Sequence, residues 1–228
     1  MDQIKVELQE WMGSDRSIAE SAWTSSLDLA KKKLRSDMDV ERIVNILADL
    51  KHSTPFESVI FRFWIRMPIF IDRQHMTHRI ASHNGSSSRY RTMSRDYFDL
   101  PDDVHMLLED KVGDFLLIEK YLESCEIANN NYSISMAVIK QAEKENKITN
   151  MEFKRIREIL RAQLPLANMV ERTSIFNLRS FANYQKLRNS NQAQIEIRRV
   201  AQLMLQEVKK AKIAPVSINA LERNNWVI

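Results

Sequence analysis

The stretch VIFRFWIRMPIFIDRQHMTH, residues 59–78, contains a strand pattern that runs directly into a helix pattern. In its first half, four apolar residues occupy every second position: Phe61, Phe63, Ile65 and Met67. The residues between them are Arg62, Trp64 and Arg66. This period of two is typical of a strand with one buried face. Pro68 suits the first turn of a helix, where its missing N–H has no helical partner. The sequence therefore predicts a strand over 59–67 and a helix from Pro68 towards His78.

The residues on both sides of this stretch are mostly helical in pattern. Asn84 and Gly85, followed by three serines, predict a loop that interrupts the helix. Beyond the loop, helical periodicity indicates helices over 102–125, 134–144, 151–163, 177–188 and 193–212, and an extended piece over 168–176. The last helix has one apolar stripe: Ile197, Val200, Ala201, Met204 and Val208. Helix is expected to dominate, with a minority of strand.

Composition limits the class of protein. A chain of 228 residues with 44% hydrophobic content can bury a sizeable core, which favours one domain over residues 1–228. The formal net charge of +4 fits small anions as well as nucleic acid. Neither a leader nor a membrane span is visible, so a cytoplasmic protein is expected. A single cysteine, Cys125, excludes an intrachain disulfide framework and a multi-cysteine zinc site.

Cations and hydroxyls crowd residues 73–91. The arginines are Arg73, Arg79, Arg89 and Arg91, and the hydroxyls are those of Ser86, Ser87 and Ser88. Asp72, His75 and His78 have a spacing that a metal could use, but the field of the arginines opposes a dication and attracts an anion. Arginine forks match phosphate oxygens, so a phosphate-bearing ligand is the better hypothesis. A solvated basic loop with core histidines remains the alternative.

Nucleophilic catalysis has little support in the sequence. The G-x-S-x-G pattern that exposes a serine nucleophile does not occur, so a binding role suits Ser87 better than attack. Cys125 lies in a helical pattern and is expected to be buried packing rather than a reactive thiolate.

One segment reads Thr77-His78-Arg79, seven residues (80–86) and Ser87, with Arg89 and Tyr90 after it. It closely resembles the signature of the flavin-dependent thymidylate synthase family, which is Arg-His-Arg, seven residues and Ser. The resemblance covers roughly residues 13–197 through several separated motifs. HSTPFES (52–58) resembles the family's His-x-Thr-Pro-Phe-Glu motif, and residues 13–26 look like its N-terminal strand and helix. RAQLP (161–165) and the pattern over 177–188 complete the resemblance.

The resemblance implies an α+β subunit with a mixed sheet and long helices, assembled into a homotetramer whose subunits share each active site. It implies reductive methylation of dUMP at uracil C5, with FAD as the cofactor. Methylenetetrahydrofolate would give the one-carbon unit and NADPH the reducing equivalents. The flavin supplies the hydride chemistry in such a reaction, while the protein supplies positioning.

Site residues follow from the matched positions. The cofactor-binding residues implied are Ser25, His52, Thr54, Thr77, His78, Arg79, Ile80, Asn177, Arg179, Asn183 and Gln192. The substrate-binding residues implied are Gln74, Gly85, Ser86, Ser87, Arg89, Arg161 and Arg188, of which Arg188 and Ser87 are also the implied catalytic residues. No metal is implied. Arg188 would be a fixed cation that stabilises charge developing on the pyrimidine, so no cysteine nucleophile is needed.

The chain departs from the family pattern at four positions. Thr77 stands where the signature has its first arginine, and Gly85 where an acidic or amide residue is usual. Gln192 replaces a frequent histidine, and Trp23 a frequent arginine, although Thr24 and Ser25 keep the hydroxyls. Such changes leave open a hydroxymethylase acting on dUMP or dCMP, a dCMP methyltransferase, or an inactive nucleotide- or flavin-binding relative. A nucleic-acid-binding module using RYRTMSR and KKKLR is the alternative from another class.

Overall fold

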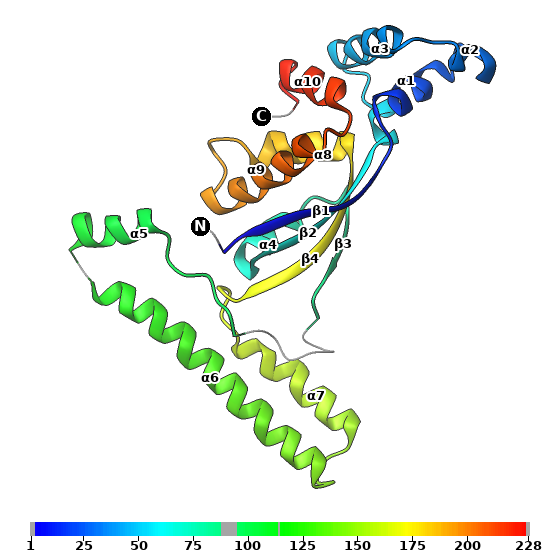
Figure 1. Cartoon of the computed structure of the whole chain (residues 1–228). Helices are drawn as coiled ribbons and strands as arrows, with labels where there is room; N and C mark the ends of the chain where they lie inside the picture. The colour runs from blue at the N-terminus through cyan, green and yellow to red at the C-terminus, as the bar shows by residue number, and fades with distance from the viewer. Residues whose placement is uncertain (1–2, 88–94, 114, 227–228) are drawn as a thin grey trace. The chain divides into compact units, whose positions relative to one another are not determined.

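The structure is a computed structural model, and it describes residues 3–87, 95–113 and 115–226 (Figure 1). Within these residues the strands are β1 (Lys5–Met12), β2 (Ile60–Pro68), β3 (Ser82–Gly85) and β4 (Met169–Asn177). The α-helices are α1 (Asp15–Trp23), α2 (Leu29–Lys33), α3 (Asp37–Asp49), α4 (Ile69–His75), α5 (Asp102–Met106), α6 (Leu116–Lys144), α7 (Asn150–Leu160), α8 (Leu178–Arg188), α9 (Ile195–Lys210) and α10 (Pro215–Arg223). Shorter turns of helix are η1 (Thr54–Ser58), η2 (Leu107–Val112) and η3 (Arg161–Gln163).

The described residues form two compact units. The sheet unit contains residues 3–66, 73–84 and 171–226, and the helical unit contains residues 67–72 and 85–170. The division passes through β2, α4, β3 and β4, so each of these elements has an end in both units.

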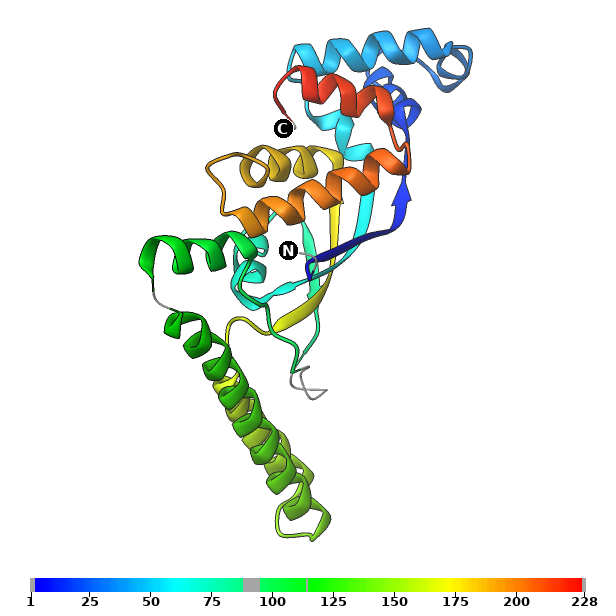
Figure 2. The ribbon, with the colours of Figure 1, turned by 60° about the vertical axis from the view of Figure 1, so that its left-hand side comes forward.

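The sheet unit is built on a sheet with strand order β1-β2-β4-β3. β1 pairs antiparallel with β2, with Leu8 opposite Phe63, and an irregularity between Leu8 and Glu10 shifts the register. Phe61 and Phe63, on the buried face of β2, pack on Phe181 of α8 with ring centroids 5.2 and 5.8 Å away. Figure 2 shows α8 and α9 side by side over the sheet, and the apolar stripe predicted for α9 is fully buried. These aromatic and aliphatic contacts fix the position of α8, whose ends carry the residues of interest below.

The N- and C-terminal helices of the sheet unit are joined through Asp15. Its carboxylate accepts from the backbone N–H groups of Val216 and Ser217, at 3.1 and 2.8 Å, at the start of α10. An anion at a helix N-terminus satisfies N–H groups that lack a helical partner. Gly13, just before α1, has φ of +91°, and a Cβ there would lie 2.4 Å from the carbonyl oxygen of Ser58. Both contacts are long-range, so short sequence windows do not reveal them.

The helical unit is held by a small apolar cluster between its two long helices. Tyr132, Met136 and Ile139 of α6 pack on Phe153 of α7. Asn129 and Asn168 form a reciprocal amide pair in the interior, with N···O distances of 3.0 and 2.8 Å. α7 begins at a capping box in which Thr149 and Glu152 satisfy each other's backbone N–H groups.

Most of the elements expected from the sequence are present in the structure, and three expectations are wrong. The expected strand over 59–67, extended piece over 168–176, and helices over 151–163, 177–188 and 193–212 are confirmed, with boundaries shifted by up to three residues. The expected loop at Asn84 and Gly85 is wrong, because these residues belong to β3. The break expected between 125 and 134 is also wrong, since α6 runs continuously through it. The N-terminal strand precedes Gly13 instead of following it. No helix among the described residues is long and apolar enough to cross a membrane.

Candidate functional site

Arg188, at the C-terminal end of α8, lies at the centre of a group of predicted site residues in the sheet unit. Its Nε donates to Nε2 of His78 over 2.8 Å, and its Nη2 donates to Oγ1 of Thr77 over 3.0 Å. A longer contact of 3.5 Å joins Nη2 to the backbone carbonyl of Gln74. The structure thus brings together four residues that the sequence analysis singled out, from α4, the turn after it and α8.

His78 is a neutral ring beside a fixed cation. Burial, the Arg188 guanidinium and His83 together lower the pKa of His78 from 6.5 to about 4. A guanidinium nitrogen only donates, so His78 Nε2 must be the unprotonated acceptor and its proton must sit on Nδ1. The ring therefore orients Arg188 without competing with an anion for it.

Gln74 has a partner that the sequence analysis did not find. Its Nε2 donates to Oε1 of Gln194, just before α9, over 2.5 Å. Gln192, the implied residue nearby, is exposed, and its backbone N–H donates to Oγ of Ser190 over 3.2 Å. No local motif marks Gln194, because its approach to Gln74 depends on the packing of α9.

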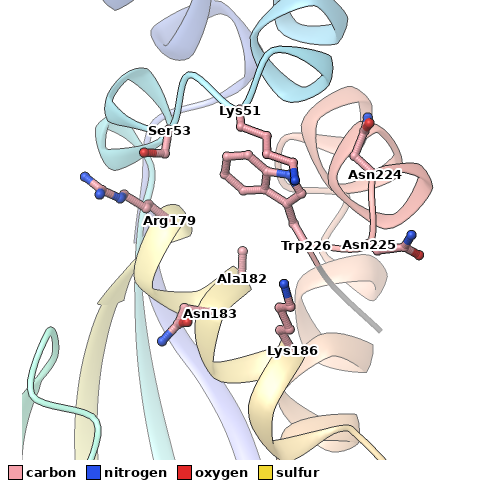
Figure 3. Close-up of a pocket in the computed structure, with 9 residues that line it drawn as sticks. All are labelled: Lys51, Ser53, Arg179, Ala182, Asn183, Lys186, Asn224, Asn225 and Trp226. Atoms are coloured by element: carbon pink, nitrogen blue, oxygen red, sulfur yellow. The ribbon is translucent and has the colours of Figure 1, made fainter.

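A cavity of about 350 Å³ lies along α8, from Arg179 near its start to Lys186 (Figure 3). Its lining residues are Lys51, Ser53, Arg179, Ala182, Asn183, Lys186, Asn224, Asn225 and Trp226. Arg179 and Asn183 were implied by the family resemblance, whereas Lys51, Lys186 and Trp226 were not. Figure 3 shows the Lys51 side chain extending towards the indole of Trp226, while Asn183 and Lys186 project from α8. Ser53 lines the cavity, and its implied neighbours His52 and Thr54 are exposed beside it.

The donors of this cavity fit a flavin dinucleotide. Lys51, Arg179 and Lys186 supply three cations, of which the Arg179 guanidinium also donates to the Glu57 carboxylate over 2.7 Å. Lysine and arginine are the side chains that hold a pyrophosphate, and the flat indole of Trp226 offers a surface for an aromatic ring. FAD carries both chemical groups, so the residues present suit it.

The other cofactor-binding residues implied in the sheet unit lie at the start of α8, after α1 and after α4. Asn177 caps α8, its Oδ1 accepting from the backbone N–H of Ser180 over 2.8 Å. Ser25 donates to the carbonyl of Ala22 over 3.1 Å in the turn after α1. Arg79 and Ile80 are exposed, and Ile80 keeps 73% of its surface in solvent. Their roles stay predictions.

Other implied substrate residues belong to the helical unit. Gly85 ends β3, and Ser86 and Ser87 follow it in a half-buried segment. Arg161 begins η3, its Nε donates to the carbonyl of Glu158 over 3.0 Å, and it lines a cavity of about 500 Å³. Arg89, Arg91 and Ser88 lie outside the described residues. The expectation that these residues share one pocket with Arg188 stays a prediction.

The structure shows the surroundings of Cys125, considered above as a nucleophile, and of His75, considered above as a metal ligand. Cys125 is buried on α6, as expected, and burial raises the pKa of its thiol. A buried thiol with a raised pKa is a poor nucleophile. His75 is also buried, and both of its ring nitrogens are engaged by hydroxyl groups. In the described part of the chain, no three His, Cys, Asp or Glu side chains are grouped as metal ligands.

Comparison with known proteins assigns the family. The model of a family described as thymidylate synthase complementing protein matches residues 7–216. A flavin-dependent thymidylate synthase of Thermosipho melanesiensis is 31% identical over 216 residues, covering 93% of this chain and 86% of that protein. A flavin-dependent thymidylate synthase of Rickettsia conorii is 31% identical, covering 90% of this chain and 71% of that protein. The chain belongs to the flavin-dependent thymidylate synthase family.

A solved structure with the same fold is a UMP/dUMP methylase from Streptomyces cacaoi, bound with 5-bromo-dUMP. The two chains align with a TM-score of 0.73 and 26% sequence identity, covering 98% of this chain and 97% of the other. The α+β class, the family resemblance and the expectation of a flavin-dependent methyltransferase are confirmed. Membership of the flavin-dependent thymidylate synthase family carries FAD as the cofactor, with folate and NADPH as co-substrates.

Proposed function

We propose that the protein is a thymidylate synthase that methylates dUMP at uracil C5, with methylenetetrahydrofolate and NADPH as co-substrates. One observation carries the proposal: Arg188 is held between the hydroxyl of Thr77 and the neutral ring of His78, at 3.0 and 2.8 Å. Neither acceptor is charged, so the positive charge of Arg188 is left for an anionic guest. A pyrimidine that reacts at C5 develops such charge on its ring.

Three groups of residues have separate roles, at the pyrimidine, at the cofactor, and at the phosphate and sugar of the substrate. Arg188 binds the pyrimidine and stabilises negative charge on it, while Gln74, held by Gln194, contacts the nucleotide. Arg179, Lys186 and Lys51 would hold the phosphates of the cofactor, which would supply the hydride chemistry when bound. Ser87, Arg89 and Arg161 hold the phosphate and sugar of the substrate. No covalent enzyme nucleophile takes part, in keeping with the buried thiol of Cys125.

A second candidate substrate is the ribonucleotide UMP. The solved structure with a TM-score of 0.73 is that of a UMP/dUMP methylase. Gly85 stands where the family has an acidic or amide residue, so it leaves more space beside the expected nucleotide site. This space favours acceptance of the additional 2′-hydroxyl of UMP. The positions at which the chain differs from the family pattern are also compatible with a cytosine nucleotide as the substrate, or with a hydroxymethyl product.

The assembly proposed is a cytoplasmic homotetramer. Three apolar residues of α6, spaced seven and four residues apart, remain at least half exposed in the single chain: Ile127, Ile134 and Val138. Met151, Ile156 and Ile159 of α7 are exposed as well. Apolar residues repeated along one helix support burial against further copies of the chain. Light scattering on the purified protein would give the mass of the assembly, and a monomer at working concentrations would contradict this part.

The activity is tested by weighing the product. Purified protein should be yellow, and incubation with dUMP, methylenetetrahydrofolate and NADPH should give a product in which a methyl group replaces the hydrogen at C5. Parallel reactions with UMP and dCMP identify the preferred base and sugar, and mass spectrometry separates a methyl from a hydroxymethyl increment. A protein that stays colourless after addition of FAD, or that modifies none of the three nucleotides, would contradict the proposal.

A further inference from the structure

A chain of hydrogen bonds runs through the interior of the sheet unit, beside the Arg188 group. The hydroxyl of Tyr184 contacts Nδ1 of His75 at 2.9 Å, and Nε2 of His75 contacts Oγ of Ser174 at 2.9 Å. Oγ of Ser174 also contacts Nδ1 of His83 at 3.0 Å, and Nε2 of His83 contacts the carbonyl oxygen of His78 at 3.2 Å. Tyr184, His75 and Ser174 are fully buried.

With His83 neutral, the last acceptor fixes the direction of every bond. A carbonyl oxygen cannot donate, so His83 must carry its proton on Nε2, and its Nδ1 accepts when the ring is neutral. Ser174 has one hydroxyl proton, which it then gives to His83 Nδ1, so its oxygen must accept from His75. His75 is therefore protonated on Nε2, and its Nδ1 accepts from the Tyr184 hydroxyl. All four protons point towards His78.

Both ends of this chain meet at His78. At one end, His83 donates to the backbone carbonyl of His78; at the other, the Tyr184 and His78 rings form a T-shaped pair with centroids 4.6 Å apart. His78 in turn accepts from Arg188 over 2.8 Å. The position of the Arg188 guanidinium thus depends on a residue that is held at its backbone carbonyl by His83 and at its ring by Tyr184.

The surroundings keep the central ring of the chain neutral. Burial is the largest cause that lowers the pKa of His75 well below 6.5. A buried polar group that loses its partner costs more than the bond contributes, so one break would disturb the remaining bonds. An aromatic or aliphatic residue could fill the same space without this risk.

We propose that His75, Ser174 and His83 are positioning residues that hold His78, and through it Arg188, in the geometry needed for reaction with the pyrimidine. None of the three needs to touch substrate or cofactor. This positioning role rests on the proposed function, because its effect is measured as kcat. The direction of the hydrogen bonds does not depend on the proposed function.

The direction of the chain can be measured without any turnover. In the protein labelled with 15N-histidine, NMR at neutral pH should show His75 and His83 protonated on Nε2 and His78 on Nδ1. Assignment uses the single variants His75→Gln and His83→Gln. A proton on Nδ1 of His75, or on both nitrogens of His83, would overturn the proposed chain even if the enzyme is fully active.

The effect on Arg188 is measured with a variant in the middle of the chain. Ser174→Ala removes one donor and one acceptor, and we expect kcat to fall roughly ten- to a hundredfold, as for a misplaced catalytic group, with bound flavin retained. Ser174→Thr keeps the hydroxyl and should retain most of the activity. Ser217→Ala is the control, because Ser217 is also fully buried and its hydroxyl bonds to Asp15 in another part of the sheet unit.

Equal kcat values for Ser174→Ala and Ser217→Ala, in proteins with the same flavin content, would overturn the positioning role. If the unmodified protein turns over no pyrimidine nucleotide, the proposed function fails instead, and NMR still decides the direction of the chain. A Ser174→Ala protein that retains no flavin or has no cooperative melting would show a merely structural role, which also contradicts the proposal.

Discussion

Nε of Arg188 donates to Nε2 of His78 over 2.8 Å, although the two residues are 110 positions apart in sequence. The bond requires a neutral imidazole, because a protonated ring would present a hydrogen and a second positive charge to the guanidinium. The state of His78 and the position of Arg188 are therefore linked.

The stability of the protein should fall in acid because of this link. The native pKa of His78 is about 4, below the ordinary 6.5, so between these values the unfolded chain binds a proton that the folded chain does not. The free energy of unfolding then decreases as the pH falls from 6.5 towards 4. Chemical denaturation across this range should show a smaller pH slope for His78→Asn. Identical slopes for the two proteins would contradict the shifted pKa.

Removing Arg188 should greatly slow turnover without removing the flavin. Arg188→Ala deletes the cation proposed to stabilise the reacting pyrimidine, and the loss of one such preorganised group costs roughly a hundredfold or more in kcat. Arg188→Lys should restore little, since an ammonium lacks the fork that reaches both His78 and Thr77. Cys125→Ala is the control and should keep nearly full turnover. A dead Cys125→Ala protein that is folded would refute the mechanism.

Thr77 should contribute through its hydroxyl. Thr77→Val keeps the shape but removes the acceptor that lies 3.0 Å from Nη2 of Arg188. A hydrogen bond of this kind contributes about 1 kcal/mol, so kcat/KM for dUMP should fall about fivefold. Thr77→Ser should retain the wild-type value. Steady-state kinetics on the three proteins decides, and a valine variant as active as the serine variant would exclude the role.

The family resemblance predicted four residues of this site. Thr77 and His78 lie in the matched signature, Gln74 just before it and Arg188 in the matched pattern over 177–188, and all four lie together. Gln194 and Trp226 were missed because their neighbours are set by the packing of α9 and by the turn after α10. The continuous α6 was missed because polar residues at 129–131 resemble a break, whereas Asn129 is paired with Asn168 in the interior. Pairing that comes from distant residues leaves no local periodicity.

The cavity beside α8 should control flavin affinity. Arg179→Ala removes a cation from the cavity wall, and loss of a charge-assisted hydrogen bond to a phosphate should weaken FAD binding roughly tenfold or more. Glu57→Gln removes the carboxylate that Arg179 contacts at 2.7 Å, and we expect a much smaller change. Titration of the apoprotein, followed by quenching of flavin fluorescence, measures both. A larger effect of Glu57→Gln would show that orientation matters more than charge.

Two glycines in the left-handed region should differ in their tolerance of alanine. Gly13→Ala places a Cβ 2.4 Å from the carbonyl oxygen of Ser58, so the backbone must move as well as bear the strain of φ +91°. Gly113 has φ +69° but no heavy atom within 4 Å of the added Cβ. Gly113→Ala should cost about 1–2 kcal/mol, and Gly13→Ala clearly more. Thermal melting of both variants tests the order.

The cavity walls also determine when flavin can be acquired. Lys51 precedes η1, whereas Trp226 follows α10, so the two sides of the cavity are synthesised far apart in time. A nascent chain on the ribosome folds from its N-terminal part, and contacts between distant segments form late. Cofactor loading should accordingly be among the last events of biogenesis, and cells starved of riboflavin should accumulate a folded apoprotein ready to be filled.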